Sequence, residues 1–327
     1  MDYMSALPRV DVAMSVLNGG KYLDEMLASL VAQTYKNWRL LVWNDGSTDD
    51  TAAILASWQA RHPDLIEVLD NPGNINLGLC GGFTRVLQET TAPYIMVADQ
   101  DDVWFPEKIE CSLSGLCRAQ SEYGQNVPLL VYTDMTVVDQ NGKIIAPSYF
   151  EKAGFRHVYE LHEIIFRSIV AGPTITMTRS LLELALPAPL DARSHDWWFA
   201  VTASAFGQII ALPERTMLYR RHGANESELC YLTFHERLNE RLGGIWKTLT
   251  TPSAARERLY ELLLWNQRIA AATLEQFGDR LTPNQRKMLH DFVQLRNLPP
   301  LRRRWAIIRH GLWFENPIVN IGYLLLA

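Results

Sequence analysis

The chain has 327 residues, of which 48% are hydrophobic and 20% are charged. This length is sufficient for one large domain with an extension, and the composition is that of an ordinary globular protein with a large core. The net charge of −5 gives no electrostatic reason to expect a nucleic acid as partner. The four cysteines lack metal-ligand spacing, so reduced thiols and a cytoplasmic setting are expected.

Membrane insertion is not expected. The N-terminus has no basic segment followed by an uninterrupted apolar stretch, so no signal peptide is predicted. No apolar run reaches the ~20 residues that a spanning helix needs. The sequence therefore predicts a protein that does not cross a bilayer.

Strand-like and helix-like segments alternate through the first hundred residues. Apolar runs predict strands at residues 10–16, 40–43, 66–69 and 94–98. Helical spacing of apolar residues appears after each of the first three strands. Ser47 with Asp50 resembles a capping box at the start of the second helix.

This alternation indicates βαβ units, and hence an α/β fold with a mostly parallel central sheet flanked by helices. In such a sheet, ligands bind beyond the carboxyl ends of the strands. Polar clusters follow three of the predicted strands, at residues 15–18, 44–47 and 99–102. A binding site is therefore expected at this edge.

The second half of the chain has a different pattern. Short strands are predicted at residues 129–132, 175–177 and 209–212. From about residue 229 the pattern is nearly all helical, with helices expected at 259–274 and 284–295. The sequence therefore predicts a helical C-terminal extension.

The fourth strand leads directly into Asp99-Gln100-Asp101-Asp102. Carboxylates at a strand end can hold a hard divalent cation, which prefers oxygen ligands and bridges phosphate oxygens. Three acids within four residues repel one another unless a cation or solvent compensates. The cluster is thus either a cation site or a solvated acidic turn.

Several motifs carry a resemblance to a known family. Five occur in the expected order: residues 10–15, Gln33-Thr34-Tyr35, residues 43–49, Asn76-Leu77-Gly78 and residues 99–104. Together they resemble the opening of family 2 glycosyltransferases. Two later motifs, His195-Asp196-Trp197-Trp198 and residues 219–223, are similar to the bacterial rhamnosyltransferase branch. The resemblance covers roughly residues 8–227.

The resemblance implies a GT-A type, Rossmann-like fold with a helical C-terminal extension. It places a catalytic domain at residues 1–228, with a nucleotide-binding half at about 1–105 and an acceptor-binding half at about 106–228. The helical extension then covers residues 229–327.

The resemblance also implies donor contacts. Ser15 and Asp45 would contact the nucleoside, with Asp45 accepting a hydrogen bond from a base N3–H that uracil and thymine have and cytosine lacks. Asn44 replaces an acid found in many relatives, and it can still cap the turn. The remaining donor contacts would be Asn18, Asn76, Gly78, Asp99, Gln100, Asp101 and Gly172. From local sequence alone, residues 44–47 are equally a plain turn before a helix, and Gly172 a strand-entry turn.

By the same resemblance, Asp99 and Asp101 would hold Mn²⁺ or Mg²⁺, with Asp101 as the more direct ligand. His222 lies where some relatives supply a further contact to the metal or diphosphate, although a surface-loop histidine is an equal alternative. The cation would neutralise charge on the diphosphate leaving group.

Asp196 is the predicted catalytic base, which would deprotonate the acceptor hydroxyl as it attacks the sugar. The alternative is that Asp196 caps a helix whose Trp197 and Trp198 belong to the core. His195 is expected to orient or shield the site.

These features predict an inverting, metal-dependent glycosyltransferase of bacterial cell-surface polysaccharide synthesis, such as O-antigen. The expected donor is dTDP-L-rhamnose, and the acceptor an oligosaccharide or a lipid-linked saccharide. Alternatives are another UDP- or dTDP-sugar, a sugar nucleotidyltransferase, or a non-catalytic scaffold. Nucleotidyltransferases resemble one another in a Gly-rich loop with Arg and Lys, where this chain has only Asn18-Gly19-Gly20-Lys21. A scaffold has no need of Asp99, Asp101 and Asp196.

The C-terminal tail mixes cations with aromatic and aliphatic residues: Arg302, Arg303, Arg304, Trp305, Ile307, Ile308, Leu312, Trp313 and Phe314. Such a segment suits peripheral contact with the cytoplasmic face of the inner membrane. Equally, it is a helix that packs its apolar face on the rest of the protein.

Overall fold

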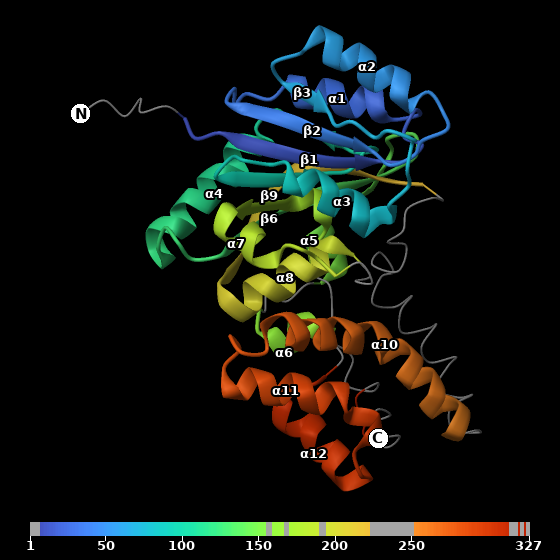
Figure 1. Cartoon of the computed structure of the whole chain (residues 1–327), viewed down its shortest axis with the longest axis vertical. Coiled ribbons are helices and arrows are strands. Elements are labelled where there is room, and N and C mark those ends of the chain that lie inside the picture. Colours follow the sequence, from blue (N-terminus) through green and yellow to red (C-terminus); the bar gives the residue numbers. More distant parts are fainter. Residues whose placement is uncertain are drawn as a thin grey trace.

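The computed structural model describes residues 7–154, 159–166, 170–189, 194–222 and 252–313, together with Asn320 and Leu324. A nine-stranded sheet occupies one end of the molecule, and the C-terminal helices form the other (Figure 1). The strands are β1 Val10–Val16, β2 Trp38–Asn44, β3 Ile66–Val68, β4 Tyr94–Ala98, β5 Val103–Trp104, β6 Leu129–Asp139, β7 Ile144–Ala146, β8 Ile175–Thr178 and β9 Gln208–Arg221.

The helices of the N-terminal part are α1 Leu23–Val31, α2 Thr51–Arg61, α3 Gly78–Gln88 and α4 Lys108–Tyr123. The next elements along the chain are α5 Tyr149–Ala153, α6 Leu161–Phe166, the 3₁₀ turn η1 Gly172–Thr174, α7 Arg179–Ala185 and α8 His195–Phe206. The C-terminal helices are α10 Pro252–Phe277, α11 Pro283–Val293, the 3₁₀ turn η3 Leu295–Asn297 and α12 Pro300–His310. The predicted α/β class with a helical extension is confirmed.

The strand order is β3-β2-β1-β4-β8-β6-β9-β5, with β7 paired to β6. The first four strands are parallel, as the alternating pattern predicted. β8 then runs antiparallel to both β4 and β6, while β6 and β9 are parallel. The description "mostly parallel" therefore holds for the N-terminal half only, because antiparallel β8 separates β4 from β6.

Side-chain alternation along the strands divides the core between the two faces of the sheet. On β1, Val10, Val12 and Met14 pack with α1 and α2, whereas Ala13 faces the side of α3. The α3 side continues through β4, β6 and α8 into the C-terminal helices as one cluster of buried residues.

The proposed capping box at α2 is wrong. The residue before α2 is Asp50, whose side chain makes no capping hydrogen bond. The Ser47 hydroxyl instead accepts the N–H of Asn18 at 2.9 Å, across from the end of β1. The Ser47 hydroxyl, which local spacing assigned to the cap of α2, therefore makes a tertiary contact instead.

The C-terminal helices pack on the second half of the sheet domain through α6 and α8. Phe277 of α10 stacks on Trp198 of α8, with ring centres 5.6 Å apart. Asn266 Nδ2 donates to the carbonyl of Ile165 in α6 at 2.7 Å. The boundary predicted at residues 228/229 lies outside the described residues, so it stays a prediction. None of the helices described in Figure 1 is both long and apolar enough to span a bilayer.

Candidate active site

The loops after β1 and β2 are tied to each other. Asn18, at a φ of 49°, accepts the N–H of Thr48 at 2.8 Å with its side-chain oxygen, while its own N–H reaches Ser47. Nearby, Gly19 N–H donates to the Thr51 hydroxyl at 2.9 Å. Asn18 therefore shapes the wall of the predicted donor site, and its direct contact with a donor stays a prediction.

Asp45 lies at the junction of β2 with the loop before α3. Its side chain is 2% exposed, and Oδ1 accepts the Trp43 indole N–H at 2.8 Å and the Leu77 N–H at 2.7 Å. In that loop, exposed Asn76 accepts the N–H of Gly78 at 2.9 Å. Asp45 thus brings Asn76 and Gly78 to the end of β2, which gathers three of the predicted donor residues.

Helix α3 closely approaches β1 at Ser15. A Cβ at Gly82 would lie 2.2 Å from the Ser15 hydroxyl oxygen, so only glycine leaves room for that side chain. Sequence reasoning did not identify Gly82; the Gly81-Gly82 pair within a helical pattern was the available signal, because an interior glycine weakens a helix and needs a packing reason.

Gln100 has a role that the sequence did not suggest. Its Oε1 accepts the N–H of Leu17 at 2.8 Å, and its Nε2 donates to the carbonyl of Leu17 at 3.0 Å. This pair of bonds fastens the end of β1 to the end of β4. The predicted contact of Gln100 with the donor stays a prediction.

Within the acidic cluster, Asp101 meets His222. Asp101 Oδ2 and His222 Nε2 are 2.7 Å apart, and both side chains are largely buried. The ring of Tyr22 stacks on His222, with ring centres 5.2 Å apart. The antiparallel pairing of β5 with β9, Val103 opposite Leu218, brings these distant segments together.

Arg220 makes hydrogen bonds that hold the same loop in place. Its Nε donates to the carbonyl of Asp101 at 3.0 Å, and its Nη2 pairs with Glu25 Oε2 at 2.5 Å. The Arg220 N–H donates to Asp102 Oδ1 at 3.1 Å. Arg220 lies in the motif at residues 219–223, but the sequence analysis predicted no role in the site for Arg220 or for Tyr22.

Asp102 differs from its neighbours because it is 1% exposed. Burial, with the charges of Asp101 and Asp99, raises the pKa of Asp102 well above its ordinary value, although the Arg220 N–H and the charge of Lys108 oppose the rise. Lys108 is also buried, and burial lowers its pKa to about 7 although the Asp102 charge opposes this. Because Asp102 is buried and its Oδ1 already accepts the Arg220 N–H, it shapes the turn.

The expected metal set of Asp99, Asp101 and His222 is not assembled. No three His, Cys, Asp or Glu side chains of the described segments converge as metal ligands. Asp101 and His222 nevertheless fit one cation, because ligand atoms at right angles on an ion with ~2.1 Å bonds lie ~3 Å apart. Their 2.7 Å contact needs to open by only a few tenths of an ångström. Mg²⁺ is often held by one or two protein ligands plus substrate phosphates and waters.

Asp196 is in the first turn of α8, and the helix is preceded by Ser194. Its Oδ2 accepts the N–H of Gly172 at 3.1 Å, and its Oδ1 accepts the N–H of Trp197 at 2.7 Å. Asp196 is therefore not the N-cap. The alternative in which Trp197 and Trp198 belong to the core is confirmed, because their indole N–H groups donate to carbonyls in the core.

His195 is buried beside the same contact. Its ring stacks on Phe83 with centres 3.9 Å apart, and neither ring nitrogen has a hydrogen-bond partner in the described part of the chain. Burial lowers the pKa of His195 although the Asp196 charge opposes the shift, so the ring is neutral near pH 7. A Cβ at Gly172 would lie 3.2 Å from Nε2, which makes Gly172 a close-fitting neighbour.

The sheet brings the acidic cluster and the region of Asp196 to one edge. Because β8 is antiparallel to β4, with Thr176 opposite Met96, the start of β8 lies at the carboxyl end of β4. The turn η1 packs against β4 and contains Gly172, which holds Asp196. Asp196 and the acidic cluster thus meet at the edge where the loops of β1 and β2 also end.

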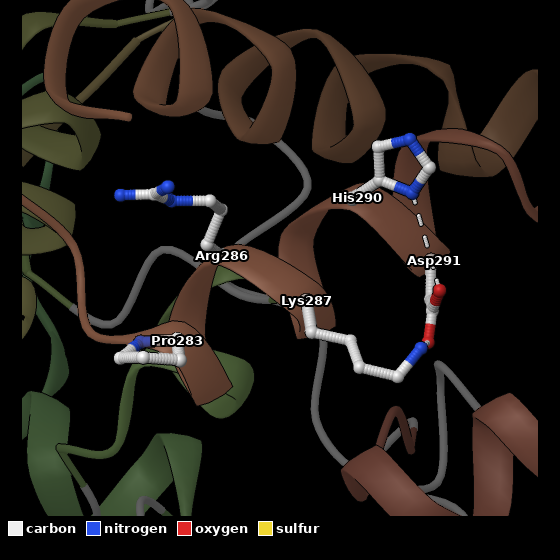
Figure 2. A pocket seen from close by; sticks show the side chains of 5 residues that line it. All are labelled: Pro283, Arg286, Lys287, His290 and Asp291. Atoms are coloured by element: carbon white, nitrogen blue, oxygen red, sulfur yellow. Dashed lines mark hydrogen bonds and ion pairs between the residues drawn. The ribbon is translucent and has the colours of Figure 1, made fainter. Parts of the chain in front are cut away.

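Two cavities lie outside the region of Asp101 and Asp196, and the second of them adjoins the carboxyl ends of β2 and β3. One of 370 Å³ lies along α11 and is lined by Pro283, Arg286, Lys287, His290 and Asp291 (Figure 2). The other, of 270 Å³, lies between α2 and the chain beyond β3 and includes Asn44. Neither is lined by Asp101 or Asp196.

Residues 11–121 match the sequence profile described as glycosyl transferase family 2. The chain contains a family 2 glycosyltransferase domain. The domain begins in β1 and ends in α4, so it includes Asp45 and the acidic cluster.

Two curated relatives extend the likeness beyond the family 2 domain. The chain is 31% identical over 145 residues to the putative glycosyltransferase EpsE of Bacillus subtilis, covering 44% of this chain and 50% of EpsE. It is 26% identical over 223 residues to the dTDP-rhamnosyl transferase RfbG of Shigella flexneri, covering 65% of this chain and 73% of RfbG. The chain thus spans about half the length of EpsE.

Solved structures share the fold of the family 2 domain and of most of the remaining chain. TarS 1–349 of Staphylococcus aureus in complex with UDP-GlcNAc superposes with TM-score 0.55 and 17% identity, covering 91% of this chain and 83% of TarS 1–349. A mannosyltransferase from Pyrobaculum calidifontis in complex with GDP-Man and Mn²⁺ has TM-score 0.51 and 18% identity, covering 95% of this chain and 89% of the mannosyltransferase. The predicted GT-A type fold is confirmed.

Proposed function

We propose that this protein is an inverting glycosyltransferase that transfers a sugar from a nucleoside diphosphate to a saccharide or lipid-linked acceptor. The observation that carries the proposal is the Asp196–Gly172 hydrogen bond at 3.1 Å, on a turn packed against β4. It supports a carboxylate base close to the acidic cluster in which β4 ends. An inverting displacement needs the base and the diphosphate-binding cluster to act on the same pair of substrates.

Asp196 is suited to the work of the base. Each carboxylate oxygen accepts one backbone N–H and keeps a second lone pair for the acceptor hydroxyl. The first turn of α8 favours negative charge through the helix dipole. The acceptor oxygen forms a bond to the sugar C1, the bond from C1 to the diphosphate oxygen breaks, and the acceptor proton passes to Asp196.

Asp101 and His222 are the residues that would hold a divalent cation, and Asp99 is a proposed third contact. A bound Mn²⁺ or Mg²⁺ supplies Lewis-acid stabilisation of the diphosphate charge. The Arg220 N–H bond to Asp102 and the Arg220 Nε bond to the Asp101 carbonyl hold the loop in place. Asp45 would accept a hydrogen bond from the base, and Ser15 and Asn18 would line the donor site next to it.

The favoured donor is dTDP-L-rhamnose. Support comes from the two downstream motifs and from the likeness to RfbG, which is named a dTDP-rhamnosyl transferase. The corresponding setting is polysaccharide synthesis in the bacterial cytoplasm, at the inner membrane where a lipid-linked acceptor would be held. Another UDP- or dTDP-sugar is the alternative.

Substitution of the base tests the reaction class. A panel of dTDP-L-rhamnose, UDP-GlcNAc and GDP-mannose with Mn²⁺ first identifies the donor, because a bound ligand raises the melting temperature by mass action. Asp196→Asn should then lower transfer by about 10²–10⁴-fold, the usual contribution of a general base. Donor affinity should change by less than about twofold, which is well below the tenfold change that corresponds to about 1.4 kcal/mol of binding free energy.

Asp279→Asn is the matched control, because Asp279 is exposed beyond the end of α10. It should transfer at the wild-type rate. Wild-type turnover by Asp196→Asn would remove Asp196 as base, and an absence of any donor-induced stabilisation would reject the function.

A further inference from the structure

Helix α12 has two unlike faces. Its inner face packs Arg303, Ala306 and Ile307, which are at most 9% exposed. The Arg303 guanidinium is used inside the fold, where Nη2 donates to the carbonyls of Arg296 and Leu298 at 3.1 and 2.9 Å. Part of the basic and aromatic tail is therefore core, as one of the two sequence-based alternatives stated.

The outer face carries a stripe of large apolar side chains. Leu301, Trp305 and Ile308 are 80%, 52% and 58% exposed. At 3.6 residues per turn they fall within about 60° of one another around the helix. Apolar side chains gathered in this way on a surface mark an interaction site more often than isolated ones do.

Exposed arginines border the stripe on both sides. Arg304 lies along one edge, and Arg302 and Arg309 lie along the other. The Arg309 guanidinium is 4.6 Å from the centre of the Trp305 ring, so the cation lies over the face of the ring. α12 contains no acidic residue.

Positive charge is also concentrated in the surrounding segment. Residues 283–313 contain seven Arg or Lys and one Asp, whereas the whole chain has 31 basic and 36 acidic residues. The segment thus has an excess of six positive charges in a protein of net charge −5. The rest of the chain is acidic on balance and is repelled by an anionic surface, whereas the α12 end is attracted to one.

We infer that the outer face of α12 docks on an anionic phospholipid bilayer. Leu301, Trp305 and Ile308 enter the boundary between headgroups and acyl chains, and Arg302, Arg304 and Arg309 pair with lipid phosphates. Such a helix lies in the plane of the interface. The part of the sheet near α2 then stays in water, because α2 and α12 lie at opposite ends of the molecule (Figure 1).

Vesicle flotation of the full chain tests this surface. The wild type should float with vesicles of equal phosphatidylglycerol and phosphatidylcholine at low salt, and much less with phosphatidylcholine alone or at high salt. The triple variant R302Q/R304Q/R309Q should bind about a hundredfold more weakly, since each arginine contributes about a fivefold factor near an anionic surface. W305S/I308S should bind at least about tenfold more weakly.

A matched triple variant, K36Q/R61Q/R118Q, removes the same charge from exposed positions on the sheet domain. It should float as the wild type does. All six positions of the two triple variants are exposed, so melting temperatures should stay unchanged and report that the fold is intact.

Three results would overturn the inference. One is no flotation of the wild type with phosphatidylglycerol vesicles, and another is wild-type flotation by R302Q/R304Q/R309Q. The third is a dimer, measured by light scattering, that W305S/I308S dissociates without any vesicle binding. That result would assign the face to a second copy of the chain.

Discussion

Each of the two carboxylates proposed to act in the site, Asp101 and Asp196, lies beside a histidine. Asp101 is held through its carbonyl by Arg220, while its carboxylate meets His222. Asp196 is held by the N–H of Gly172, next to a neutral His195. In both pairs a backbone contact sets the position of the carboxylate. That arrangement leaves carboxylate lone pairs available for a substrate or a cation.

Removal of one Asp101 oxygen tests the cation site. Asp101→Asn should weaken Mn²⁺-dependent binding of a nucleoside diphosphate by at least about tenfold, the loss typical when a metal site is altered. Binding measured in EDTA should be equal for the variant and the wild type. Calorimetric titration with and without Mn²⁺ makes both comparisons.

Glu107→Gln is the control for that measurement, because Glu107 is an exposed acid a few residues away. It should bind metal and nucleotide as the wild type does. Unchanged Mn²⁺ dependence in Asp101→Asn would contradict the assignment of Asp101 as a ligand.

At the scale of elements, one buried acid joins three segments of the sheet. Asp11 on β1 is 0% exposed and pairs with Arg39 Nε on β2 at 2.8 Å. Its second oxygen accepts the N–H groups of Thr91 and Ala92, just before β4. Burial raises the pKa of Asp11, but the hydrogen bond from Arg39 and those from the two backbone amides outweigh it, and the net pKa is lowered.

This lowered pKa predicts a pH dependence of stability. Asp11→Asn should cost about 3 kcal/mol at pH 7, because it leaves the Arg39 charge without its buried partner. The ionised Asp11 stabilises the fold fully above the unfolded-state pKa of 3.8 and loses this contribution as pH falls through the lower folded-state value. The difference between wild type and variant, measured by urea unfolding, should therefore shrink below about pH 4.

The surface partner of Arg39 provides the comparison. Glu67 is 55% exposed and 3.1 Å from Arg39, so Glu67→Gln should change stability by less than about 1 kcal/mol. A difference between wild type and Asp11→Asn that is constant from pH 7 to acid would contradict the ionic explanation.

Across the whole molecule, the apolar core joins the sheet to the C-terminal helices. The buried cluster that begins at Ala13 of β1 continues to Leu312 beyond α12. Phe277 lies between the two parts, stacked on Trp198 and edge-on to Phe206 at 5.0 Å. Leu324, near the end of the chain, packs on the same cluster.

A continuous core predicts cooperative unfolding. Phe277→Ala should lower the free energy of unfolding by about 3–5 kcal/mol, because it removes a buried ring from both parts at once. Tryptophan fluorescence and far-ultraviolet circular dichroism should give one coincident transition in denaturant for the wild type and the variant.

Leu301→Ala is the control, because Leu301 is 80% exposed; it should change stability by less than about 0.5 kcal/mol. Two separate transitions, with only the weaker one shifted by Phe277→Ala, would show that the extension folds independently of the sheet.

Much of the fold was predictable from the sequence because its signals are local. The strands at residues 10–16 and 94–98 have the predicted bounds, since a run of apolar residues between polar loops specifies a buried strand. The acidic cluster and the Asn44 turn were also found, because polar residues directly follow such strands. The long β6 and β9 were found only in part, since their polar residues pair with distant partners.

The amino-acid sequence by itself determined the α/β class, the order of the motifs and the residues that carry the proposed chemistry. Only the tertiary structure decided which of them touch. The antiparallel insertion of β8 placed Gly172 and Asp196 at the end of β4, and the β5–β9 pairing placed His222 on Asp101. The tertiary structure also divided helix α12 of the tail into a buried and an exposed face. The physical reason is that periodicity reports neighbours along the chain, whereas strand pairing and burial depend on residues far away in the sequence, 80 positions apart for Met96 and Thr176 and more than 100 for Val103 and Leu218.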